Sequence, residues 1–399
     1  MVDLEIILKS ILPERKRSIA DLRIKGKQIS ELVNGRFLDP GEKIFFRDVS
    51  FPAEQIPGGE GQDNISFPEI LIKYCGLDRN IDISDLLFID TETTGLAGGT
   101  GTFAFMIGTG HFEPETFTVH QYFLTDLSAE SLLIGYLEKE IGNFRGFVSF
   151  NGKSYDIPLL QTRFIINHSD FRLSSLDHID LLHLSRRIWG SKLESCSLQN
   201  LEKFVLRENR DHSQDIPANM IPQVYFHYLD NGDATEIIPI LYHNRYDIVS
   251  MVSLLKKITA ILENPAQEIA SEVAELSRIA KLYEDCREDI TAQNLYEAVL
   301  TERSEHSFSR KRLSFLYKKN GQIDKACECW QQAVTEDELY ACEELAKFEE
   351  HVKMNIAKAL EWTLKGIEIL NKSCFLDHKK LMELTNRRDR LSGKLNRNG

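Results

Sequence analysis

The stretch from Leu86 to Gly101, L-L-F-I-D-T-E-T-T-G-L-A-G-G-T-G, constrains the fold of this chain most. Its apolar beginning, residues 86–89, is typical of a buried strand. A strand places Asp90 and Glu92, two residues apart, on the same face of the extended chain. Adjacent carboxylates repel each other and lose hydration unless a cation lies between them. Because hard divalent ions prefer oxygen ligands, the stretch predicts a metal site. The simpler interpretation is a solvated strand end.

The segments around this stretch alternate between strand and helix patterns. Further strands are expected at 103–107, 116–124, 146–150 and 179–181, and a long helix at 236–261. Such alternation predicts a mixed α/β sheet with flanking helices over residues 81–264. Residues 1–80 are predicted to form a helical lead-in and a short hairpin, whose turn we place at Asn34-Gly35 because Asn-Gly favours tight hairpin turns.

A different, purely helical pattern follows Asn264-Pro265 and repeats every 34 residues. Small and aromatic residues at this period are typical of tetratricopeptide helix–turn–helix units. A third unit follows near Ala359, and residues 376–397 resemble the atypical cap that ends such arrays. Residues 265–399 are therefore predicted to form an all-α helical-repeat domain, with a plain helical bundle as the alternative. The equivalent pairs are Ala280 and Ser314, Tyr283 and Tyr317, Ala292 and Ala326, and Tyr296 and Trp330.

Composition narrows the classes of function. At 399 residues the chain is too long for one ordinary core. No apolar stretch is long enough to span a membrane, and the first residues lack a secretory pattern. The seven cysteines, with no C-x-x-C pair, are expected to be reduced thiols in a cytoplasmic protein. The net charge of −13 argues against nonspecific coating of nucleic acid, but it is compatible with an enzyme whose acidic residues bind metal ions.

Three further residues could complete a metal site. Asp156, in N-G-K-S-Y-D, lies where a strand end meets a helix start, and its simpler interpretation is a helix cap. Asp247 follows His243 by four residues on the predicted long helix, so both side chains project from one helix face. A surface ion pair would explain that spacing equally well. Asp180 could also belong to the site, although an ordinary turn residue is the favoured interpretation.

Taken together, these motifs resemble a known family. D-T-E-T-T-G, N-x-x-x-Y-D and a ring residue before a late aspartate are similar to the DEDD-type exonucleases of the ribonuclease H-like superfamily. The longer runs D-T-E-T-T-G-L-A-G-G-T-G-T, I-D-L-L-H-L-S-R-R-I-W-G and S-C-S-L-Q-N-L-E resemble its YprB-like branch more closely. The resemblance covers about residues 30–260. It implies a ribonuclease H-like sheet and four metal ligands, namely Asp90, Glu92, Asp156 and Asp247.

The resemblance also implies catalytic roles, with one departure from the family pattern. Glu92 would orient the attacking water, and His243 would stand where the family places its water-activating Tyr or His. The His branch usually spaces this residue H-x-x-x-x-D, whereas His243 has the Y-x-x-x-D spacing of the Tyr branch. Tyr242, at the longer spacing, is a rival for the role. Which of the two residues is the base therefore stays open at this point.

The sequence thus predicts a metal-dependent nuclease, most plainly a 3′–5′ exonuclease. Two divalent ions, Mg²⁺ or Mn²⁺, would neutralise the charge on the attacking and leaving oxygens of a phosphodiester. The expected substrate is nucleic acid, either DNA or RNA. A protein partner is expected to bind the C-terminal repeats. The alternative function is a non-catalytic scaffold built on a degenerate nuclease fold and the repeats.

Overall fold

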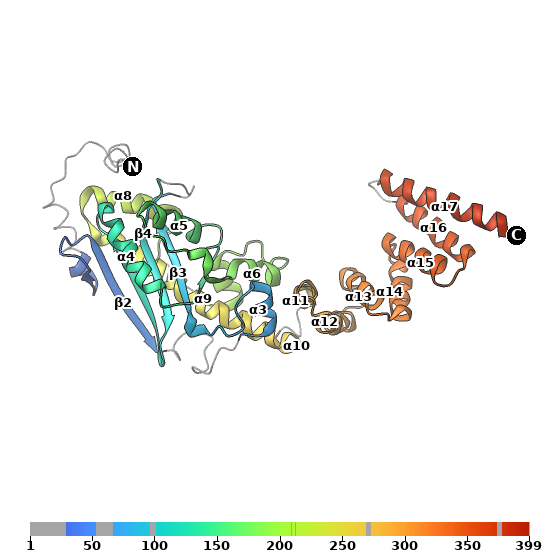
Figure 1. The fold of residues 1–399 in the computed structure, drawn as a ribbon, viewed down its shortest axis with the longest axis horizontal. Coiled ribbons are helices and arrows are strands. Elements are labelled where there is room, and N and C mark those ends of the chain that lie inside the picture. The colour runs from blue at the N-terminus through green and yellow to red at the C-terminus, as the bar shows by residue number, and fades with distance from the viewer. Residues whose placement is uncertain are drawn as a thin grey trace. The chain divides into compact units, whose positions relative to one another are not determined.

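The protein folds into two compact units, residues 1–268 and residues 269–399 (Figure 1). The computed structural model describes residues 29–52, 67–95, 101–208, 210–211, 213–268, 273–372 and 377–398. Nearly all of the predicted helical lead-in and the 56–65 loop lie outside these ranges. We call residues up to 268 the sheet unit and the residues after them the helical unit.

A seven-stranded mixed sheet organises the first unit and confirms the predicted fold class. The strand order is β1-β2-β5-β4-β3-β6-β7. β3 is an interior strand, antiparallel to β4 and parallel to β6, which in turn pairs in parallel with β7. The strands are β1 (Arg36–Phe37), β2 (Ile44–Pro52), β3 (Leu86–Thr93), β4 (Ala104–Phe112), β5 (Thr116–Leu124), β6 (Gly146–Ser149) and β7 (Asp177–Asp180).

The sheet begins earlier in the chain than residue 81, the boundary drawn from the sequence. β2 pairs with β5 over its whole length, from Ile44 opposite Leu124 to Pro52 opposite Thr116. The short hairpin is formed by β1 and β2, and its turn lies at residues 38–43, so the prediction of a turn at Asn34-Gly35 is wrong. The Asp39 carboxylate makes this turn by accepting hydrogen bonds from the backbone amides of Lys43 and Ile44, both at 2.9 Å.

Helices cover both faces of the sheet. Gly108 and Gly110 of β4 face α9 on the side where any other residue would carry its side chain. A Cβ added at either position would lie within 2.6 Å of Ile248 of α9. Because side chains alternate along a strand, Thr109 and His111 of β4 point to the opposite face, which α4 covers. The helices are α3 (Glu69–Cys75), α4 (Glu130–Ile141), α5 (Asp156–Ile166), α6 (Leu181–Trp189), α7 (Leu198–Leu201), α8 (Ile221–Asn231), α9 (Ile238–Glu263) and α10 (Pro265–Glu268).

The second unit is all-helical, as the sequence predicts. Helices adjacent in sequence pack against each other, beginning with α11 against α12 and ending with α16 against α17. The residues of the 34-residue period lie at equivalent buried positions, including Tyr296 on α12 and Trp330 on α14. The helices are α11 (Val273–Asp285), α12 (Asp289–Glu302), α13 (Ser307–Lys319), α14 (Ile323–Thr335), α15 (Leu339–His351), α16 (Ile356–Lys372) and α17 (His378–Asn398).

Within the described ranges, no helix is both long enough and apolar enough to cross a membrane.

Candidate active site

The interior strand β3 carries the first two predicted site residues. Asp90 and Glu92 are half-buried and pair with Gly108 and Met106 of β4, so they share the sheet face that α9 covers. Asn244 of α9 donates a 2.9 Å hydrogen bond to Asp90 Oδ2. A side chain at residue 108 would collide with Asn244, since a Cβ there would lie 2.2 Å from its Oδ1. Gly108 therefore allows α9 to approach β3 closely enough for this contact.

Asp156 reaches the same strand from the first residue of α5. The hydroxyl of Thr91 donates to Asp156 Oδ1 at 2.5 Å, which ties the start of α5 to β3. The loop before Asp156 is shaped by Asp180, whose carboxylate accepts hydrogen bonds from the backbone amides of Asn151 and Lys153 and also caps α6. Asp180 therefore acts as a loop and cap residue, in agreement with the turn interpretation.

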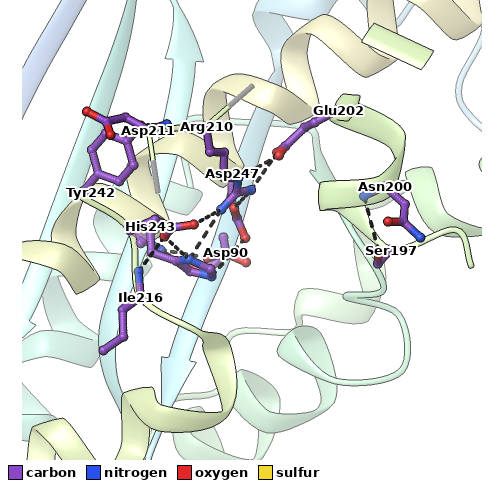
Figure 2. Close-up of polar contacts among 12 residues, drawn as sticks. Asp90, Ser197, Asn200, Glu202, Arg210, Asp211, Ile216, Tyr242, His243 and Asp247 are labelled. Atoms are coloured by element: carbon purple, nitrogen blue, oxygen red, sulfur yellow. Dashed lines mark hydrogen bonds and ion pairs between the residues drawn. The ribbon is translucent and has the colours of Figure 1, made fainter. Parts of the chain in front are cut away.

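Asp247 lies on α9 and contacts a buried arginine that the sequence did not single out. Arg210 pairs with Asp247 Oδ1, and two of its nitrogens donate to Glu202 at 2.6 and 2.7 Å (Figure 2). Asp215 lies 3.5 Å from the same guanidinium. Because arginine stays charged and its planar fork matches carboxylates, Arg210 fixes the orientation of Asp247. The second carboxylate oxygen of Asp247, Oδ2, lies 3.7 Å from His243 Nε2.

The two ring residues of α9 point in different directions. His243 is 5% exposed, and its Nδ1 lies 2.7 Å from Asp215 Oδ1. A proton on Nδ1 makes this hydrogen bond, which leaves the Nε2 lone pair on the side of Asp247. The Tyr242 hydroxyl instead accepts a 3.3 Å hydrogen bond from the Asp211 backbone, and the ring lies apart from Asp90 and Asp247 (Figure 2). Neighbouring positions on a helix differ by about 100° in direction, which separates the two rings.

The carboxylates interact strongly with one another. Burial raises the pKa of Asp90 well above its ordinary value, and the charges of Asp247 and Asp156 raise it further. Burial and the same neighbours also raise the pKa of Glu92. The pKa of Asp156 rises to about 6 through burial, although the Thr91 hydrogen bond opposes the shift. All four predicted ligands therefore belong to one electrostatic cluster, in which a cation would relieve the repulsion.

The donor chemistry of this cluster suits a hard divalent ion. Four carboxylates offer only oxygen ligands, the type that Mg²⁺ and Mn²⁺ prefer. Their oxygens are turned toward protein donors, Asn244 for Asp90 and Arg210 for Asp247, and among the described residues they do not form a group of three within 4.8 Å. Since one oxygen of Asp90 and one of Asp247 make these contacts, the second oxygen of each can serve as a ligand.

Sequence reasoning missed the residues that hold this cluster in place. Asn244 adjoins His243 on α9 and could have been found from its helix face. Arg210 and Asp215 lie in the irregular segment between the π-helical turn 202–206 and α8, where the chain has no period to interpret. Their contacts depend on how this segment folds over α9. No sequence signal would have found them.

Comparison with known proteins finds similarity to a superfamily. Residues 87–259 match a family model described as RNase_H superfamily, so this part of the chain is similar to ribonuclease H superfamily domains. The protein YprB of Bacillus subtilis (strain 168) is 29% identical over 341 residues, which span 82% of this chain and 80% of YprB. A family B DNA polymerase from the hyperthermophilic archaeon Pyrobaculum calidifontis shares 14% identity at a TM-score of 0.32. That match covers 50% of this chain and 28% of the polymerase.

Proposed function

We propose that this chain is a metal-dependent nuclease, a DEDD-type 3′–5′ exonuclease that hydrolyses nucleic-acid phosphodiester bonds. The observation that carries the proposal is the meeting of carboxylates from β3, α5 and α9 in one electrostatic cluster beside His243. These residues come from separate parts of the chain. A surface ion pair or a helix cap would explain single residues but would not bring all of them together. The match of residues 87–259 to the RNase_H superfamily model supports the same class of enzyme.

Each carboxylate has a role in this proposal. Asp90, on the interior strand β3, would contact both metal ions, and Asp156 and Asp247 would each contact one. Glu92 would contact a metal ion and orient the attacking water. Two Mg²⁺ or Mn²⁺ ions supply Lewis-acid stabilisation of the attacking and leaving oxygens. Asn244 and Arg210 keep Asp90 and Asp247 oriented before an ion binds, which reduces the reorganisation that binding requires.

His243 is the base that we propose. Its Nδ1–H donates to Asp215, so the neutral imidazole presents Nε2 to the carboxylate cluster and can accept a proton from water there. Asp215 fixes the tautomer and the ring orientation, in the way that a carboxylate orients the histidine of other hydrolytic sites. Tyr242 has no comparable contact with the cluster. Its hydroxyl is bound to the Asp211 backbone amide.

The helical unit has a separate role in this proposal, as a tetratricopeptide-like module that binds a protein partner. Its residues 269–399 carry 23 acidic and 22 basic side chains, so its net charge gives little attraction for nucleic acid. Three basic side chains of α17, those of Arg387, Arg390 and Lys394, already bind Glu350 of α15. They are therefore less available for phosphate contacts than the sequence alone indicates.

The proposed function is tested with end-labelled DNA and RNA substrates and the purified full-length protein. Hydrolysis should require Mg²⁺ or Mn²⁺, stop with chelator, and release mononucleotides from one end. Substrates labelled at the 5′ or the 3′ end separate 3′–5′ from 5′–3′ degradation. Absence of hydrolysis on every substrate with either metal would favour the scaffold function instead. Release of internal fragments would keep the nuclease and reject the exonuclease.

A further inference from the structure

A second group of metal-binding side chains lies on the other face of the sheet. His111 of β4, His120 of β5 and Glu140 of α4 each offer a ligand atom, and these atoms lie within 4.8 Å of one another. Thr109 pairs with His120 across β4 and β5, and its hydroxyl donates to Glu140, so these side chains share the face that α4 covers. Asp90 lies on the α9 face. The two groups are therefore separated by the sheet itself.

The contacts within this group leave polar atoms unused. His120 Nδ1 lies 2.6 Å from Glu140 Oε1, and the Thr109 hydroxyl donates to the same oxygen at 2.9 Å. His111 Nδ1 and Glu140 Oε2 are buried, and neither has a hydrogen-bond partner among the described residues. Tyr122 lies beside Glu140 on the same face; burial, the Glu140 charge and a hydrogen bond to Glu140 all raise the pKa of the Tyr122 hydroxyl. Buried polar atoms without partners are rare in native proteins, and an unseen ion is one recognised explanation.

We propose that His111, His120 and Glu140 bind a divalent transition-metal ion of the zinc type. Two imidazoles and one carboxylate are a known zinc ligand set, with water as the fourth ligand. The half-buried rings leave room for that water, because the side chains of His111 and His120 are 15% and 23% exposed. Zinc ligands lie about 2.0–2.2 Å from the ion. The donor atoms therefore need only small side-chain shifts to close around it.

Binding would replace a proton by the metal. In the metal-free group, the neutral His120 ring donates its Nδ1–H to Glu140. When the ion binds, this proton moves through solvent to Nε2 of the same ring, so the neutral imidazole and the carboxylate can both bond to the ion. Burial lowers the pKa of His111, which keeps its imidazole neutral and its lone pair available. The ion would join the end of the β4–β5 hairpin to the last turn of α4. We infer a structural role, since the group lies on the sheet face opposite to Asp90 and Glu92.

The two metal sites would select different ions. Imidazole ligands favour Zn²⁺ over Mg²⁺, whereas four carboxylates favour Mg²⁺ or Mn²⁺. Millimolar Mg²⁺ should therefore fill the carboxylate cluster and leave the histidine group for zinc. This selectivity allows the zinc site to be tested independently of the proposed nuclease function.

The test measures zinc retained by the full-length protein after dialysis against buffer with excess Mg²⁺. We expect about one zinc per chain in the wild type and in Asp90→Asn, and at least a tenfold weaker affinity in His111→Ala and Glu140→Gln. The matched control is His227→Ala. His227 makes a similar 2.8 Å contact with Glu236, but it belongs to no such three-donor group among the described residues. This control should keep its zinc.

Two measurements guard against variants that fail to fold. Zinc should raise the unfolding temperature of the wild type by roughly 5 °C or more at a hundredfold excess over Kd. Co²⁺ in place of zinc should give the visible absorption of a four-coordinate, imidazole-bound ion in the unmutated protein. A wild type that retains no zinc and gives no such absorption overturns the proposal. Zinc that is lost in Asp90→Asn but kept in His111→Ala also overturns it.

Discussion

The predicted metal-ligand carboxylates of the sheet unit lie beside one another, whereas the buried Glu350 of the helical unit lies among basic side chains. Glu350 of α15 accepts hydrogen bonds from Arg387, Arg390 and Lys394 of α17, and its pKa falls to about 2. The pKa of Asp156 instead rises to about 6. A carboxylate that is paired with basic side chains of the protein, such as Glu350, stabilises the fold. Carboxylates that raise one another's pKa destabilise the fold unless a cation from solution binds between them.

The difference between the two kinds of carboxylate can be tested by substitution, and the largest effect on activity is expected for Asp90→Asn. The change removes a ligand that would contact both ions, so hydrolysis should fall by about 10²-fold or more. The metal-free variant should unfold at the same or a higher temperature than the wild type, because one repelling charge is gone. End-labelled substrate assays and calorimetry in chelator measure the two effects.

Asp48→Asn on β2 is the matched control for this change. Asp48 is an exposed acid, paired only loosely with Arg36 at 3.6 Å, and its loss should leave both measurements unchanged. If Asp90→Asn kept full activity on every substrate, Asp90 would not be a ligand. A sharp loss of stability would show that Asp90, like Glu350, serves the fold.

A somewhat smaller loss of activity is expected for His243→Ala. General acid–base catalysis contributes about 10²-fold at the lower end of its usual range, so turnover should fall by about 10²-fold while metal binding persists. Asp215→Asn should cause an intermediate loss, because it weakens only the orientation of the ring. Tyr242→Phe should stay close to the wild type. A Tyr242→Phe variant more impaired than His243→Ala would reverse our assignment of the base.

The stability of the helical unit should respond to Glu350→Gln. Three basic side chains would lose their shared carboxylate, which we expect to cost about 1–2 kcal/mol, since Arg390 and Lys394 are nearly half exposed and partly screened by solvent. Denaturant unfolding followed by circular dichroism measures this loss. Glu368→Gln on α16, where two lysines bind an exposed glutamate, should change stability much less. Equal effects of both substitutions would contradict the special role of Glu350.

The smallest expected effect is a pH dependence of opposite sign in the two units. The lowered pKa of Glu350 contributes stability that is present above its unfolded value of about 4.3 and is lost as pH falls toward 2. The raised pKa of Asp156 contributes stability that is present below about 3.9 and is lost as pH rises through about 6. In chelator, raising the pH from 5 to 7 should therefore destabilise only the sheet unit.

Calorimetry at several pH values, with chelator and then with Mg²⁺, measures this effect. Added Mg²⁺ should remove most of the loss near pH 7, because the ion takes the place of the bound protons. A sheet unit that becomes more stable between pH 5 and pH 7 in chelator would contradict the raised pKa of Asp156.

The sequence by itself determined the features that follow from local periodicity. Strand alternation was enough to place Asp90 and Glu92 on one face, and the four-residue helical spacing placed His243 near Asp247. The alternating segments predicted a mixed sheet, and the 34-residue period predicted the helical unit. These features depend on backbone geometry within a few residues, or on one unit repeated, so no knowledge of distant contacts was needed.

The tertiary structure alone decided which distant residues meet. β2 joins the sheet only by pairing with β5, about 70 residues later, so the sequence boundary at 81 excluded it. Gly108 lets α9 lie close to β3, and that approach gives Asn244 its contact with Asp90. Arg210 and Asp215 hold the α9 side chains from an irregular segment. Such contacts depend on packing between elements, which the side-chain pattern of a single segment does not encode.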